Sequence, residues 1–405
     1  MRALMLLAIV LAAACGKGPI PTQGTDAAVT PDASPANDRL YVARTNGGLT
    51  IVDLAADKAV RDLPPGVMAP DRSAYWTVEP GPTTIVRKLD PASGQELTRY
   101  AVNGTFDLPR GYGPLADAIS SNGRFLTLTR PGGDAFGFTV IDLRDGTERG
   151  RATLRGSFTF DAIDDLGGSL YLLEHPQPSA PERYNVRLFD LLAGALLPSA
   201  IVDQKAAVPT AADLARGTMG GLYHASAVAG AWHFGVYTNV TKGPVVHALN
   251  MTARFASCLF DVTSATSHPS AWAIATTPAR AFVVNAASGA FVSIDAGTLM
   301  TAKRTFSVEP GAEAGLRGSA VVTPDGKRLY ATGGKGIVVV DAHTLSMKAQ
   351  YLTDRQFTSV IVSSDGSRLY AMERSGAIAR IDPATGREVG IVVSVPSAVS
   401  IVRID

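Results

Sequence analysis

Residues 319–351, SAVVTPDGKRLYATGGKGIVVVDAHTLSMKAQY, contain a complete pattern of four short strands. Residues 319–323 alternate, and Asp325-Gly326 is a strong hairpin signal before a second strand at 328–332. A Gly-rich turn at 333–336 leads to a third, β-branched strand at 337–340, and 347–351 complete the pattern. This stretch therefore predicts four antiparallel strands joined by tight turns.

The same pattern recurs along the chain. The tripeptide Arg-Leu-Tyr occurs at 39–41, 328–330 and 368–370, and its last two copies begin 40 residues apart. A repeat of this length, with four strands in each unit, is typical of β-propeller blades. We therefore predict an all-β chain with a single β-propeller at 39–405. It would have eight four-stranded blades, or seven if the divergent fifth unit, around 231–262, is an insertion.

The two ends of this region complement each other. The first unit, RLYVARTNGGLTIVDLAADKAV at 39–60, begins at its second strand. Residues 398–404, AVSIVRI, match a first strand but have no hairpin partner after them. We expect this C-terminal strand to pair with 40–43 in the N-terminal blade. The pairing would close the ring and cover an exposed edge that favours aggregation.

RLYVARTNGGLTIVDLAADKAVRDLPPG at 39–66 resembles the repeats of YVTN-type β-propeller proteins. More loosely, the chain resembles the wider group of propellers that has quinoprotein-like and lactonase-like members. The resemblance covers roughly 39–405 and implies the blade architecture. It does not imply one activity, because members of the group have different functions.

The first 38 residues are typical of a targeting segment. Arg2 precedes an apolar run at 3–14, which is too short to span a bilayer and fits the apolar region of a signal peptide. Cys15 follows three alanines and resembles the lipidated cysteine of a bacterial lipobox, although Ala12 stands where leucine is commonest. Ordinary secretion with an incidental cysteine is the alternative.

Three domains follow from these features. We expect a lipoprotein signal peptide at 1–14, the lipidated Cys15 with a disordered linker at 15–38, and the propeller at 39–405. Residues 16–38 contain no aromatic residue and are rich in Pro, Thr, Ala and Asp, a composition that does not fold alone. The predicted location is a membrane anchor facing the periplasm or the cell exterior.

The remaining motifs exclude several classes of function. A formal net charge of +1 provides no basic field that would attract nucleic acid. The sequence contains no G-x-S-x-G elbow, HExxH motif, P-loop or paired CxxC. We therefore assign no catalytic residue, no metal site and no cofactor, and we expect a monomer.

Two sets of residues have a metal-binding interpretation that we weigh against a structural one. Carboxylates that close the third strands are expected to accept backbone hydrogen bonds in the next turn, rather than to form a metal ring. Histidine and cysteine side chains between 224 and 268 could hold zinc or copper. They lack the closely spaced pairs of most metal sites, so we favour the interpretation that they are ordinary residues of the blades. His233 and His247 are expected on neighbouring strands. The carboxylates are Asp53, Asp90, Asp142, Asp190, Asp295, Asp341 and Asp382; the second set is His224, His233, His247, His268 and Cys258.

Long loops indicate where a ligand would bind. In a propeller, the loops from each fourth strand to the next first strand share one face with those from second to third strands. We call it the loop face. Segments 103–116, 175–184 and 203–226 exceed the usual connection length. An Arg- and Tyr-rich rim suits an anionic or protein ligand, although any solvated loop can have this composition. The predicted binding residues are Arg110, Tyr112, Arg183, Tyr184, Arg216, His224, Arg317 and Arg355.

Three classes of function are compatible with this pattern. The favoured one is a membrane-tethered, non-catalytic binding or scaffold module for a protein, peptide or glycan at the loop face. The second is a lactonase-like or other hydrolytic enzyme with its site in the central channel. The third is a redox- or metal-associated accessory protein. Whether the chain is an enzyme stays open at this point.

Overall fold

The computed structural model describes residues 39–109, 118–130, 132, 135–239, 243–259, 269–309 and 317–405. The expected signal peptide and linker, with Cys15, lie outside these residues. All described residues belong to one unit, Asn37–Asp405. Among the described residues, no helix is both long and apolar enough to cross a membrane.

The described residues form antiparallel sheets with two short helices, α1 (Ala211–Arg216) and a 3-10 turn, η1 (Pro269–Ala271). The first sheet has the order β3 (Lys58–Leu63), β2 (Leu49–Asp53), β1 (Arg39–Arg44), β31 (Ala398–Ile404). The next three comprise β4 (Gly66–Met68), β5 (Tyr75–Glu79), β6 (Thr83–Leu89) and β7 (Glu96–Asn103); β8 (Phe125–Arg130), β9 (Ala135–Asp142) and β10 (Glu148–Arg155); and β11 (Phe158–Ile163), β12 (Ser169–Glu174), β13 (Arg183–Asp190), β14 (Ala195–Leu196) and β15 (Met219–Gly220).

The remaining sheets complete the order along the chain. They comprise β16 (Leu222–Ala229), β17 (Trp232–Asn239), β18 (Gly243–Asn250) and β19 (Phe255–Leu259); β20 (Trp272–Thr277), β21 (Arg280–Asn285), β22 (Ala290–Asp295) and β23 (Thr301–Thr305); and β24 (Ser319–Val322), β25 (Arg328–Thr332), β26 (Lys335–Asp341), β27 (Met347–Val362), β28 (Leu369–Glu373), β29 (Ala377–Ile381) and β30 (Glu388–Ser394).

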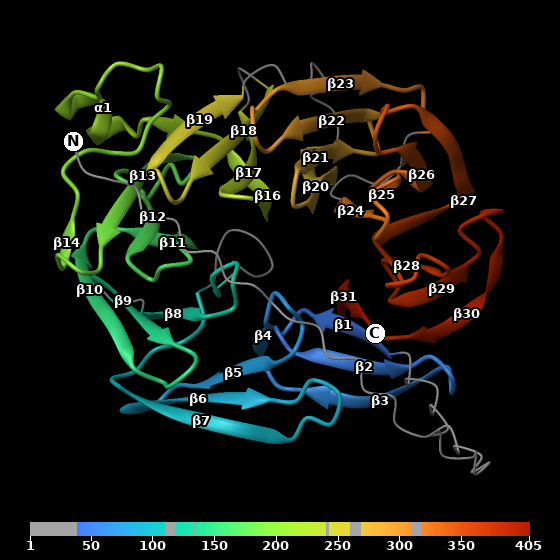
Figure 1. The fold of residues 1–405 in the computed structure, drawn as a ribbon, viewed down its shortest axis with the longest axis horizontal. Coiled ribbons are helices and arrows are strands. Elements are labelled where there is room, and N and C mark those ends of the chain that lie inside the picture. Colours follow the sequence, from blue (N-terminus) through green and yellow to red (C-terminus); the bar gives the residue numbers. More distant parts are fainter. Residues whose placement is uncertain are drawn as a thin grey trace, which may run out of the picture. The chain divides into compact units, whose positions relative to one another are not determined.

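These sheets are arranged as a β-propeller. Figure 1 shows them following one another in chain order around the middle of the unit, with one strand of each sheet facing the middle. In the described part of the chain, six sheets of three to five strands form separate blades. The prediction of an all-β propeller is therefore confirmed.

The described residues form six separate blades and one seven-stranded sheet, rather than the predicted eight or seven separate blades. The units expected as the seventh and eighth blades share one seven-stranded sheet, because β27 is continuous over 16 residues. Its first part pairs with β26 as far as Gln356, and from Phe357 it pairs with β28. The sequence between these parts contains no Gly or Pro that would end the strand. The divergent fifth unit, in contrast, is a regular four-stranded sheet, β16–β19.

The last strand lies beside the first. β31 pairs antiparallel with β1, with Leu40 opposite Ile404 and Val42 opposite Ile401, as the sequence predicts for these two strands. The Tyr41 hydroxyl also donates a hydrogen bond of 2.8 Å to the Asp405 carboxylate. β1 is therefore an inner strand of its sheet rather than an edge.

The carboxylates that close the third strands bind the turns that follow them. Asp341, for example, accepts hydrogen bonds from the backbone N–H groups of His343 and Thr344 at 3.0 and 2.8 Å. The same turn contact is made by Asp53, Asp90, Asp142, Asp190, Asp295 and Asp382. The structural interpretation of these residues is confirmed, since each side chain fixes a tight turn.

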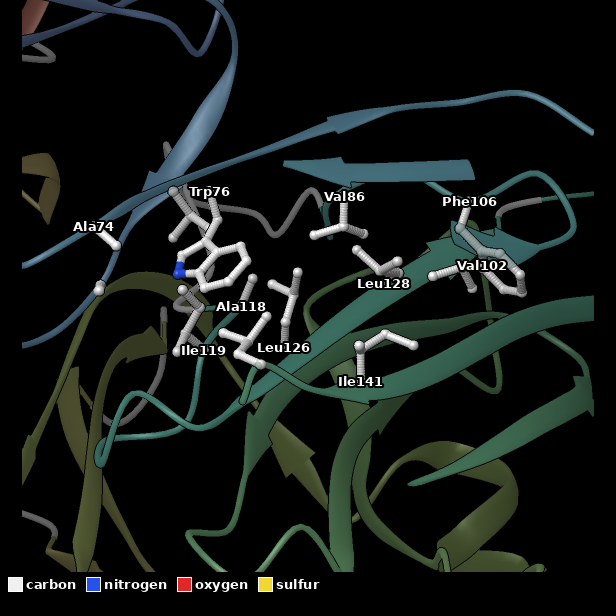
Figure 2. Close-up of a cluster of buried hydrophobic side chains, with 13 residues drawn as sticks. Ala74, Trp76, Val86, Val102, Phe106, Ala118, Ile119, Leu126, Leu128 and Ile141 are labelled. Atoms are coloured by element: carbon white, nitrogen blue, oxygen red, sulfur yellow. The ribbon is translucent and has the colours of Figure 1, made fainter. Parts of the chain in front are cut away.

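Apolar side chains fill the space between neighbouring blades. Figure 2 shows Trp76 of the β4–β7 sheet against Ile119 and Leu126 of the next unit. Trp232 and Trp272 lie together in a second buried cluster, between the β16–β19 and β20–β23 sheets. The tryptophans therefore stabilise the packing of one blade on the next.

Candidate functional site

A central cavity of about 620 Å³ lies among the inner strands of the propeller. Its walls come from β16, β20, β24, β27 and β31, each of which lies next to the following one. Most of the lining residues lie at or near the beginnings of these strands, where the chain arrives from the preceding blade, and Thr358 lies within the long strand β27. The cavity is therefore at the loop face, on which the sequence places the ligand.

The repeat itself positions the hydroxyl groups around this cavity. Ser319 at the beginning of β24 accepts a hydrogen bond from the backbone N–H of Val360 in β27, at 3.2 Å. Forty residues further on, Ser359 accepts the equivalent bond from Ile401 in β31, at 2.9 Å. Serines in register thus connect neighbouring inner strands.

His224 supplies a neutral imidazole to the wall. Its Nε2 lies 2.5 Å from the Thr238 hydroxyl on the adjacent strand. Burial lowers the pKa of His224 to about 4, because the charged form loses its hydration. At neutral pH this side chain therefore offers a hydrogen bond and no charge.

Arg317 supplies the positive charge. It is the one charged side chain among the described residues that line the cavity. It is exposed, and within the described ranges no carboxylate forms an ion pair with it. Six of the other lining residues carry hydroxyl groups, so a ligand with a carboxylate or another anionic group would find both a cation and several hydrogen-bonding partners. The polar lining residues are Tyr223, His224, Ser226, Ser270, Arg317, Ser319, Thr358 and Ser400.

Two other predicted residues, Arg183 and Arg216, line a separate cavity of about 880 Å³. One wall is α1, whose first turn is capped by Thr210: its side chain accepts from the Asp213 N–H at 3.2 Å. Arg216 pairs with Asp213 at 2.8 Å. The expectation that 203–226 is one long loop is therefore wrong, because the segment contains α1, β15 and the beginning of β16.

Two further predicted residues, Tyr184 and Arg355, do not line these cavities. Tyr184 is only 2% exposed, with its ring centroid 5.3 Å from that of Tyr237, and burial raises its pKa well above the usual value of 10.0. Arg355 forms ion pairs with Glu373 and Glu388. Arg110 and Tyr112 lie outside the described residues.

Sequence reasoning missed the hydroxyl residues of the central cavity. Ser270, Ser319 and Ser400 carry no charge and lie at or just before strand beginnings instead of in long loops, and Thr358 lies within β27. A signal for one of them, Ser319, exists in the repeat, because Ser359 stands at the same position of the next unit, although Ser359 is buried and does not line the cavity. Aligning the first strands, rather than comparing loop lengths, would have found this position.

The histidines of the fifth unit are buried in its sheet. His233 and His247 lie on the adjacent strands β17 and β18, as predicted, and are 5% and 2% exposed. Burial lowers the pKa of His247 to about 4. Among the described residues, no group of three or more His, Cys, Asp or Glu side chains is arranged to hold a metal ion. His268 lies outside these residues.

Comparison with known proteins supports the architecture. No family model matches the chain, and no curated protein is similar to it in sequence. Among solved structures, it is similar to the dihydro-heme d1 dehydrogenase NirN in complex with DHE, at 14% identity and a TM-score of 0.55, over 95% of this chain and 77% of that chain. It is also similar to apo AztD from Citrobacter koseri, at 11% identity and a TM-score of 0.55, over 90% and 96% of the two chains. At these identities the likeness establishes a β-propeller fold and no more.

Proposed function

We propose that this chain is a membrane-tethered, extracytoplasmic binding module that holds its ligand at the loop face. The central cavity receives an anionic group of a protein, peptide or glycan, and the surrounding loops contact the rest of the ligand. No bond of the ligand is made or broken in this function.

The observation that carries the proposal is the position of Arg317 in the cavity wall. Arg317 is exposed and lines the same cavity as Ser270, Ser319 and Ser400, whose hydroxyl groups can donate further hydrogen bonds to an anionic ligand. A hydrogen bond that involves a charged group contributes about 1.5–3 kcal/mol. Neutral His224 adds a hydrogen-bonding group without adding charge.

The blade count and the closure of the ring belong to this proposal. We infer that β27 serves as the outer strand of one blade and the inner strand of the next, so that the sequence units correspond to eight blades. The separate pairing of its two parts with β26 and β28 supports this inference. The pairing of β1 with β31 supports a closed ring, in which the central cavity has walls of fixed spacing.

The membrane tether is tested by Cys15→Ser in the full chain. If Cys15 carries the lipid anchor, the variant should move from the membrane fraction to the soluble fraction after cell disruption. A Cys258→Ser variant should stay in the membrane fraction and serves as the control. A Cys15→Ser variant that still requires detergent would contradict the anchor.

Ligand binding is tested with a panel of peptides with free carboxyl termini and of acidic glycans. The affinity of any ligand found should fall at least about tenfold in Arg317→Gln, which corresponds to about 1.4 kcal/mol. Arg304→Gln is the matched control, because Arg304 lies exposed on the outer strand β23. Equal affinity of Arg317→Gln and the unchanged protein would refute the assignment of this cavity.

The same purified protein can be used to test the two alternative functions, the hydrolytic enzyme and the redox- or metal-associated accessory protein. If the protein hydrolyses a lactone or ester and Arg317→Gln abolishes this activity, the hydrolytic function would replace the binding proposal. Similarity to NirN, a dehydrogenase by its name, keeps the redox-associated alternative in the test. Stoichiometric heme in the purified protein, or a metal ion held at the central cavity, would favour that third class.

A further inference from the structure

We propose a second site that binds a single Cu(I) ion between the fourth and fifth units, with Cys258, Met219 and His247 as its ligands. Cys258 lies in β19, His247 in β18, and Met219 in β15, which pairs with β13 of the preceding unit. The site is independent of the central cavity and of the function proposed for it.

The two sulfur atoms are already at a suitable separation. The Cys258 Sγ lies 4.0 Å from the Met219 Sδ. Metal–sulfur bonds are about 2.3 Å long, so two sulfurs bound to one ion at an angle of about 120° lie about 4.0 Å apart. The observed distance therefore fits a three-coordinate ion without movement of the backbone.

His247 supplies the second, independent observation. It stands directly opposite Cys258 in the antiparallel pair of β18 and β19, so both side chains lie on the same face of the sheet. It is 2% exposed, and its Nε2 has no hydrogen-bond partner among the described residues. A buried polar atom without a partner is costly, and a bound ion would satisfy it.

Neighbouring aromatic rings show that Met219 and His247 lie on the same side of the contact between the fourth and fifth units. Met219 is paired in register with Tyr184. The Tyr184 ring lies 5.3 Å from that of Tyr237, which lies 6.4 Å from the His247 ring, both measured between centroids. The three proposed ligands therefore surround one group of buried tyrosines at the contact of the two units.

The chemistry of the donors selects the ion. Thiolate and thioether sulfur favour Cu(I) over harder divalent cations. Binding breaks the Cys258 S–H bond, forms a Cu–S bond and releases one proton to solvent, while Met219 and His247 each donate a lone pair. No electron is transferred, because copper enters as Cu(I). Cys258 and Met219 also line the cavity of about 880 Å³ beside α1, which gives the ion a path to them.

The experiment is an anaerobic competition titration of the full chain. Purified protein is added to Cu(I) held by a coloured bidentate chelator, and the loss of colour measures transfer of copper to the protein. We expect the unchanged chain to take up one equivalent of Cu(I) more than the Cys258→Ser variant. Both proteins contain Cys15, so Cys15 does not contribute to this difference. One proton should be released for each ion that this site binds.

Met219→Leu is the decisive variant, because it preserves side-chain volume and leaves the thiol in place. Its affinity for Cu(I) should fall at least tenfold. Met300→Leu should leave the affinity unchanged, because Met300 is 73% exposed on the surface. X-ray absorption of the loaded protein should show sulfur and nitrogen ligands.

Equal copper uptake by the unchanged chain and Cys258→Ser would overturn the site. So would an affinity that Met219→Leu does not change, which remains measurable if Cys258→Ser fails to fold. Tighter binding of Zn²⁺ than of Cu(I) would overturn the choice of ion. None of these outcomes depends on Arg317, so they leave the central-cavity proposal untouched.

Discussion

Replacing Ile404 by alanine should strongly destabilise the propeller. Ile404 is 2% exposed in β31 and belongs to a buried cluster with Leu40 and Val42 of β1. Alanine lacks three carbon atoms of isoleucine, and each buried methylene-sized group contributes about 0.8 kcal/mol, which gives about 2.4 kcal/mol. The cavity left behind raises the expected loss of unfolding free energy to about 2–5 kcal/mol.

Guanidinium unfolding followed by circular dichroism measures this loss. Ile391→Ala is the matched control, because Ile391 is 48% exposed on β30, the preceding strand along the chain, and its loss should change stability by less than about 0.5 kcal/mol. Similar unfolding midpoints for Ile404→Ala and the unchanged protein would refute the reasoning. Such a result would mean that β31 contributes little to holding the first sheet together.

Three further predictions concern a turn, a carboxylate and a histidine. Gly386→Ala should cost at least about 2 kcal/mol of unfolding free energy, because φ is +71° and a Cβ would lie 2.1 Å from the Tyr351 ring. Gly194→Ala, at φ +64° with open space around it, should cost only about 1 kcal/mol in the same denaturation assay, and equal costs would rule out the clash. Burial raises the pKa of Asp142, but hydrogen bonds from two arginines outweigh it and hold the pKa below the usual 3.8. The stability that this carboxylate contributes is thus fully present above that value and is lost as the pH falls below it, so acid titration of Asp142→Asn should show a weaker dependence on pH. Because the pKa of His224 is about 4, ligand affinity at the central cavity should show no His224 inflection between about pH 6 and pH 8, and an inflection removed by His224→Gln would contradict this.

The repeat pattern was sufficient to predict much of the fold. The pairing of 398–404 with 40–43 followed from counting strands, because one unit lacked an inner strand and another strand had no partner. The role of Asp341 and its counterparts followed from local turn chemistry. The first follows from the number of strands in each repeat and the second from local turn chemistry, and both can be read directly from the sequence.

The blade boundary at β27 and the make-up of the cavities could not be predicted in the same way. Whether residues 352–357 end one strand or continue into the next depends on the spacing of two packed units, which local propensity does not determine. Arg355 was expected at the loop face, yet it forms ion pairs with Glu373 and Glu388. Tyr184 was expected at the rim, but its strand carries it into the contact between two units.

The contact between β1 and β31 has a consequence for biosynthesis. Tyr41 and Asp405 are hydrogen-bonded across 364 positions of the chain. The first sheet therefore stays one strand short while the ribosome makes everything in between, with the Leu40 backbone lacking its final partner. Such distant pairing favours slow folding, and the edge of the N-terminal sheet stays open to aggregation until β31 pairs with it.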